Sequence, residues 1–103
     1  MSIYQLINDF KANPPRTEEA ARKFLANASE LEAQQLIAAL YIGREHIHNQ
    51  RLRSDMSISR SYTDHISPDE YARILYEKGD NVIAYFDKLL SCAKASEFDL
   101  ETL

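Results

Sequence analysis

The chain has 103 residues, a mass of 11.9 kDa and a formal net charge of -4, with 45% hydrophobic and 27% charged residues. This composition fits one globular domain, and the low content of glycine (2) and proline (3) argues against a loop-rich β-sandwich or barrel. Because Cys92 is the single cysteine, no internal disulfide and no zinc cluster of cysteines can form. The sequence shows no signal peptide and no apolar run of the ~20 residues that span a bilayer. It therefore predicts a cytoplasmic protein without membrane contact.

The N-terminal part of the chain predicts two short amphipathic helices. Ser2 can cap the first of them. Its apolar residues recur at helical spacing and share one face: Ile3, Leu6, Ile7 and Phe10. Pro14 and Pro15 end this helix, because proline disfavours helical backbone at the residue before it and cannot continue the hydrogen-bond ladder. Thr17 can then cap the second helix.

A long helix is predicted over residues 30–48 and is the expected centre of the fold. Ser29 and Glu32 form a capping box at its start. Its apolar stripe contains Ala33, Leu36, Ile37, Leu40 and Tyr41. Gly43 lies inside this helix, where glycine costs about 1 kcal/mol relative to alanine. We therefore interpret Gly43 as the point where another helix approaches closely.

Residues 49–66 show no helical or strand periodicity, so a flexible loop or a short frayed helix is expected. Because loops carry binding functions more often than packed elements do, this segment is expected to contribute to any interface. The charge around it is uneven. Residues 44–60 carry four arginines and two acidic residues, net +2, whereas residues 61–103 carry four basic and nine acidic residues, net -5. This asymmetry favours charge pairing within the chain or between subunits.

A helical hairpin is predicted over residues 68–94. Ser67 and Glu70 form a second capping box, with Pro68 at the first helical position. Gly79 supplies the left-handed residue that ends the first helix of the pair.

These elements together predict an all-α fold: a compact bundle of about five helices with a long central helix and a C-terminal helical hairpin. The predicted domain covers residues 1–95, and residues 96–103 are predicted to be a frayed acidic tail. Nearly complete burial is expected for five core residues: Leu36, Leu40, Ile74, Phe86 and Leu89.

Two segments resemble a small, uncharacterised bacterial family of domains of unknown function. Residues 31–45, LEAQQLIAALYIGRE, resemble the central helix of that family, which ends in a Gly-Arg pair, here Gly43-Arg44. Residues 71–90, YARILYEKGDNVIAYFDKLL, resemble its C-terminal pair of helices, which are separated by a glycine. The resemblance implies an all-α fold and no known activity.

Little in the sequence indicates catalysis or a bound metal. On a helix, His46 and His48 lie about 200° apart and cannot hold one ion together, so solvated or interfacial histidines are expected. Cys92 has no neighbouring histidine and acid, and two glycines are too few for a phosphate-binding loop. Paired carboxylates fall at helix starts, where capping and the helix dipole explain them. We therefore expect no catalytic residue, no cofactor and no metal: the protein is not predicted to be an enzyme.

Binding of nucleic acid is unlikely from the charge of the chain but forms the main alternative. The helix pair over residues 71–90 is poorly suited to bind DNA as a helix-turn-helix, because its second helix offers Asp80 and Asp87 at exposed positions. The better candidates are the arginines of residues 44–60: Arg44, Arg51, Arg53 and Arg60. The net charge of -4 opposes their binding to phosphates.

The predicted function is a non-catalytic protein–protein interaction module that self-associates as a homodimer or binds an unidentified protein. Tyrosine and arginine are frequent at interfaces, and Gly43 would let two long helices approach each other. The candidate interface residues are Tyr41, Gly43, Arg44, Ile47, Arg51, Arg53 and Tyr62. The alternative is a small nucleic-acid-associated regulator that uses the arginines of residues 44–60.

Overall fold

The computed structural model describes residues 2–103, and the regular structure in that range is helical throughout. The α-helices are α1 (Ile3–Ala12), α2 (Glu18–Ala26), α3 (Glu30–Glu45), α4 (Tyr71–Glu77) and α5 (Asn81–Ala95). The single-turn 3-10 helices are η1 (Arg60–Tyr62), η2 (Pro68–Glu70) and η3 (Leu100–Thr102). The predicted all-α fold of about five helices is confirmed. No helix within residues 2–103 is both long and apolar enough to cross a membrane.

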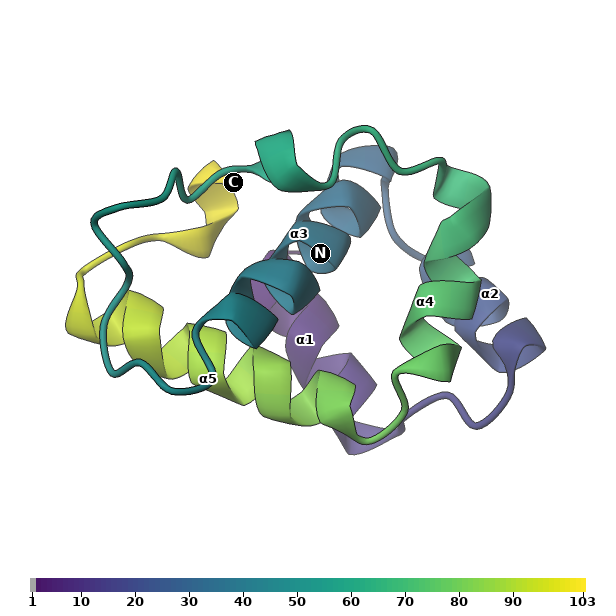
Figure 1. Ribbon diagram of the computed structural model, residues 1–103. Coiled ribbons are helices and arrows are strands. Elements are labelled where there is room, and N and C mark those ends of the chain that lie inside the picture. Colours follow the sequence, from purple (N-terminus) through teal and green to yellow (C-terminus); the bar gives the residue numbers. More distant parts are fainter. Residues whose placement is uncertain (1) are drawn as a thin grey trace.

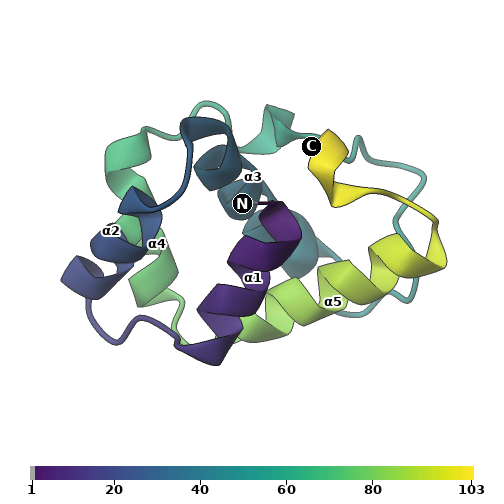
Figure 2. The same ribbon diagram turned by 180° about the vertical axis from the view of Figure 1, so that it is seen from behind.

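Helix α3 is the centre of the bundle (Figure 1). Helix α5 packs along α3, and α1 crosses α3 on the side seen from behind in Figure 2. Helix α4 packs on α2 at the other end of the molecule. The turn between α4 and α5 contains Gly79 in the left-handed conformation (φ +55), as predicted. The two helices are consecutive in sequence, but each makes its main contacts with a different partner, α2 for α4 and α3 for α5.

The first three α-helices begin at the predicted capping residues. The Ser2 and Thr17 side chains each accept a hydrogen bond from a backbone N–H in the first turn of the following helix. At the start of α3, the Glu32 N–H donates to Ser29 Oγ at 3.1 Å and the Ser29 N–H donates to Glu32 Oε1 at 2.8 Å. The predicted capping box is therefore present, and it satisfies two backbone donors that a helix start leaves free.

The second predicted capping box does not form. Ser67 accepts a hydrogen bond from the Asp69 N–H at 3.4 Å and begins η2 rather than an α-helix. The Glu70 carboxylate does not return to Ser67 but accepts hydrogen bonds from the Arg73 guanidinium. The Glu70–Arg73 salt bridge thus takes the place of the expected bond from Glu70 to the Ser67 backbone, and α4 begins at Tyr71.

Gly43 is the point of closest approach between α3 and α5. A Cβ atom on Gly43 would lie 2.1 Å from the carbonyl oxygen of Tyr85, a distance that no real contact allows. The predicted role of Gly43 in close helix packing is confirmed, and the neighbouring helix belongs to the same chain. Gly43 is buried and is therefore not available to a second copy, so the sequence-based argument for a homodimer through this glycine is lost.

Helix α3 ends at Glu45, three residues before the predicted boundary, because His46 turns the chain. The His46 ring is fully buried, with Nδ1 2.7 Å from the Ile42 carbonyl oxygen, while Nε2 accepts a hydrogen bond from the Arg53 N–H at 3.0 Å. The proton therefore sits on Nδ1, since Nε2 must be the acceptor. The expectation of a solvated or interfacial histidine is wrong at His46, which instead links the end of α3 to the segment that follows.

Residues 49–66 are irregular, as predicted, and hydrogen bonds attach them to both neighbouring helices. The Leu52 N–H donates to Ser96 Oγ at 3.0 Å, near the end of α5. The Arg60 guanidinium donates to Gln34 Oε1 on α3 at 2.6 Å. Thr63 is only 2% exposed. These contacts attach the segment to α3 and to the C-terminal end of α5, and in Figure 1 it loops from the end of α3 to η1.

The C-terminal residues belong to the core, so the prediction of a frayed tail after residue 95 is wrong. Leu100 is fully buried and Leu103 is 8% exposed. The buried Gln35 side chain on α3 donates to the carbonyl oxygens of Glu101 and Leu103, both at 3.1 Å. The acidic residues obscured this outcome: Glu101 of η3 is exposed, while Leu100 of η3 and the following Leu103 are buried. The single domain therefore continues to the last residues of the chain.

A hydroxyl on α1 also holds this C-terminal segment, and its removal tests the packing. The Tyr4 O–H donates to Asp99 Oδ1 at 2.9 Å and its oxygen accepts from the Leu100 N–H at 2.8 Å. We expect Tyr4→Phe to lower the free energy of unfolding by about 1 kcal/mol, measured by urea denaturation. Tyr76→Phe is the control, because Tyr76 is 46% exposed and should show no change. Equal stability of the two variants would contradict the observed docking of η3.

The five residues predicted for the core are at most 7% exposed, so this prediction is confirmed. Phe86 of α5 also makes an edge-to-face contact with Phe10 of α1 at 5.4 Å, and Phe10 makes a second one with Phe24 of α2 at 5.6 Å. This aromatic row connects α1, α2 and α5.

Candidate binding site

A cleft of about 550 Å³ lies between the C-terminal half of α3 and the segment that follows it, and we call it the α3 cleft. One wall is helical and the other is irregular. The lining residues are Tyr41, Ile42 and Glu45 from α3 and Arg53, Asp55, Met56, Tyr62, Thr63, His65 and Ile66 from the segment. The cleft forms because the chain turns at His46, at the end of α3, and the His46 ring then bonds to Ile42 of the helix and to Arg53 of the following segment.

Two of the charged groups in the α3 cleft neutralise each other. Arg53 Nε donates to Asp55 Oδ1 at 2.9 Å, and its terminal nitrogen donates to Asp55 Oδ2 at 2.8 Å. These hydrogen bonds lower the pKa of the Asp55 carboxyl and raise the pKa of the Arg53 guanidinium. Glu45 is exposed and makes no ion pair within residues 2–103, so it leaves one surplus negative charge at the cleft.

The Arg53–Asp55 pair predicts a local pH dependence. The folded-state pKa of Asp55 lies below its unfolded value, so the pair stabilises the fold above the pKa of an unfolded aspartate, and this contribution is lost as the pH falls through the folded value. In an NMR titration we expect Arg53→Gln to return the pKa of Asp55 to the ordinary range. Arg51→Gln, which changes a nearby exposed arginine without an ion pair among the described residues, should leave it unchanged. Equal effects of the two variants would contradict the pairing.

The uncharged part of the α3 cleft is lined by aromatic and aliphatic side chains. Tyr62 is 48% exposed at its rim, while Tyr41 is half-buried and has Lys78 Nζ at 5.3 Å from the ring centroid. Met56 and Ile66 are half-buried. Tyrosine offers apolar area together with a hydroxyl, and methionine adapts to irregular surfaces. Such a lining suits the side chains of a partner.

The predicted interface residues do not all come together in the structure. Tyr41, Arg53 and Tyr62 line the α3 cleft together. Arg44 is exposed on α3 next to the cleft, and Gly43 is buried against α5.

The other two predicted residues lie outside the cleft. Ile47, 38% exposed, and Arg51 are on the turn that follows α3 and do not line it. Sequence reasoning missed Glu45, although its spacing of four residues from Tyr41 places both on one helix face.

The arginines of residues 44–60 do not act as one basic patch. Arg53 is bound to Asp55, and Arg60 lies 3.9 Å from Asp64, four residues further along the chain. The Arg53 pair lies within residues 44–60, whereas Arg60 pairs with an aspartate of the acidic segment 61–103. Within residues 2–103, Arg44 and Arg51 make no ion pair.

The nucleophile and metal candidates lie away from the cleft or are engaged. The Cys92 S–H donates to the Asn49 carbonyl oxygen at 3.5 Å, and burial raises the pKa of this thiol, which lowers its reactivity. Across the described part of the chain, no three side chains of histidine, cysteine, aspartate or glutamate converge as a metal site would require.

A second groove, of about 610 Å³, lies between α2 and α4. Much of its floor consists of short or buried side chains, including Ala26, Ala28, Ala33 and Ala72. It has one tyrosine, Tyr71, which is 4% exposed and so presents little of its ring. This groove lacks the exposed aromatic and methionine side chains that the α3 cleft presents.

The fold is a small helical bundle, and its α3 cleft is lined by both aromatic and charged side chains. No family model matches the chain, and neither a curated protein nor a solved structure matches it.

Proposed function

We propose that the protein is a non-catalytic protein–protein interaction module whose docking surface is the α3 cleft. One observation carries this proposal: Tyr41, Tyr62, Met56 and Arg53, four side chains of the types enriched at interfaces, line a single concave site on the surface. Binding hot spots favour tyrosine and arginine in pockets of this kind.

The charged groups of the cleft support binding rather than catalysis. Arg53 and Asp55 satisfy each other through two hydrogen bonds, so neither is poised to exchange a proton with a substrate. Their pairing also limits the motion of the Arg53 side chain before a partner arrives, which reduces the entropy lost on binding.

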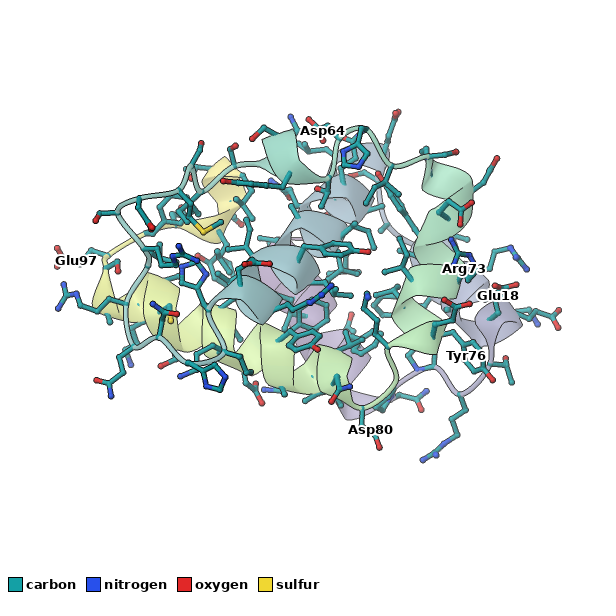
Figure 3. The ribbon with its side chains drawn as sticks, viewed as in Figure 1. Glu18, Asp64, Arg73, Tyr76, Asp80 and Glu97 are labelled. Atoms are coloured by element: carbon teal, nitrogen blue, oxygen red, sulfur yellow. The ribbon has the colours of Figure 1, made fainter. Side chains whose placement is uncertain are left out.

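Selection of random peptides displayed on phage tests this function. We expect Tyr62→Ala to weaken binding of the selected peptides by about thirtyfold, the effect of losing a hot-spot residue of about 2 kcal/mol. Tyr76→Ala is the matched control: Tyr76 is 46% exposed against 48% for Tyr62 and lies on the outer side of α4, away from the cleft (Figure 3). Peptides that bind the Tyr62→Ala variant as tightly as the wild type would contradict the proposal.

The alternative function, binding of nucleic acid, is supported by Arg44 and Arg51, which make no ion pair among the described residues. Two phosphate contacts would give a slope of about -1.8 in a plot of log K against log salt for duplex DNA. We expect no retained complex near physiological salt, as measured by fluorescence anisotropy. Micromolar binding that is lost in an Arg44→Ala, Arg51→Ala double variant would favour the alternative.

A further inference from the structure

We infer that the partner of this surface is a second copy of the chain, related by a two-fold axis that brings Arg44 of each copy to Glu45 of the other. This inference rests on the proposed function, because it names the partner for the same face of α3. Three observations support it: the openness of this helix face, the unpaired charges on it, and their order along the helix.

The face of α3 beside the cleft is open to a partner. Tyr41, Arg44 and Glu45 are spaced by three and four residues, so their side chains lie on one side of the helix. Arg44 and Glu45 are exposed. In Figure 1 the near side of α3 is not crossed by another ribbon, whereas α1 covers its far side in Figure 2.

The charges on this face are of opposite sign, and neither has an ion pair within residues 2–103. They cannot readily pair with each other, because adjacent side chains on a helix diverge. Other helices of this protein do pair their exposed charges at helical spacing: Glu18 with Arg22, Glu19 with Lys23, and Arg73 with both Glu70 and Glu77. Arg44 and Glu45 have no such partner among the described residues, although they are neighbours of opposite sign on one helix.

A neighbouring pair of opposite charges is self-complementary under a two-fold rotation. In such an interface, if one residue of the first copy contacts another residue of the second, the reverse contact is made as well. Arg44 and Glu45 would then form two equal ion pairs around the axis. Tyr41 on the same face and Tyr62 at the rim of the cleft would supply the apolar contact area beside them.

The size of the open face determines how strongly two copies of the chain are expected to associate. A stable interface buries about 800 Å² on each partner, a large share of the 5992 Å² that this chain exposes. We expect a contact built on one helix face to be weaker than such an interface, so the association should depend on concentration. It also weakens at high salt, because exposed ion pairs are screened.

Charge reversal combined with sedimentation equilibrium tests the inference directly. At low salt and up to millimolar protein, we expect the wild type to dimerise and Arg44→Glu or Glu45→Arg to weaken association by about tenfold or more. The double variant Arg44→Glu, Glu45→Arg should restore it, and an equimolar mixture of the two single variants should form a heterodimer. Arg51→Glu is the control, since it changes the net charge as Arg44→Glu does, but lies off this face.

The outcomes separate the inference from the function on which it rests. A constant monomer mass up to millimolar protein, or a dimer insensitive to both single reversals, overturns the two-fold contact. Circular dichroism of each variant is the folding control, and we expect these exposed substitutions to leave the helical spectrum unchanged. Peptide binding that still depends on Tyr62 would then leave the proposed interaction module standing with a different partner.

Discussion

Leu40→Ala is expected to lower the free energy of unfolding by about 2–5 kcal/mol. Leu40 is fully buried in α3, the helix on which α1 and α5 pack, so truncation leaves a cavity that these helices cannot readily close. The loss combines the transfer free energy of the deleted methyl groups with the contacts missing around the cavity. Urea denaturation followed by circular dichroism measures it.

Leu31→Ala is the matched control for this prediction. It makes the same chemical change on the same helix, but Leu31 is 49% exposed. We expect its effect to stay within about 0.5 kcal/mol. A loss below about 1 kcal/mol for Leu40→Ala would mean that α3 is not the central helix of the fold.

Gly43→Ala is expected to destabilise the protein by about 3 kcal/mol, at the upper end of the cost of overpacking. The added Cβ would meet backbone, the Tyr85 carbonyl oxygen at 2.1 Å, so α3 and α5 must move apart. Helix propensity alone predicts the opposite sign, a gain of about 1 kcal/mol. The sign of the measured change in the free energy of unfolding therefore decides between the two.

Gly79→Ala separates steric overlap from backbone strain. Gly79 has a φ of +55, and a Cβ there would have no atom within 4 Å. We expect a loss of about 1 kcal/mol from the left-handed conformation alone. If Gly43→Ala were no more destabilising than Gly79→Ala, the close approach of α3 and α5 would be contradicted.

The candidate site was partly accessible to sequence reasoning. Residue type and a place near an irregular segment predict Tyr41, Arg53 and Tyr62 as interface residues one at a time. Their convergence in one cleft depends on His46, whose ring accepts a hydrogen bond from the Arg53 N–H after the chain has turned. That bond spans seven residues and a change of chain direction, so no helical periodicity indicates it.

Features that depend on neighbouring residues follow directly from the sequence. The start of α3 follows from Ser29 and Glu32, which bond across three residues, and the left-handed turn at Gly79 follows from the missing Cβ. The ordered acidic C-terminus does not follow in this way, because the Gln35 side chain must reach the Leu103 carbonyl oxygen, 68 residues away. The physical reason is the range of the interactions: caps and helical stripes involve neighbours within one turn, whereas burial depends on surfaces that meet only after the chain has folded.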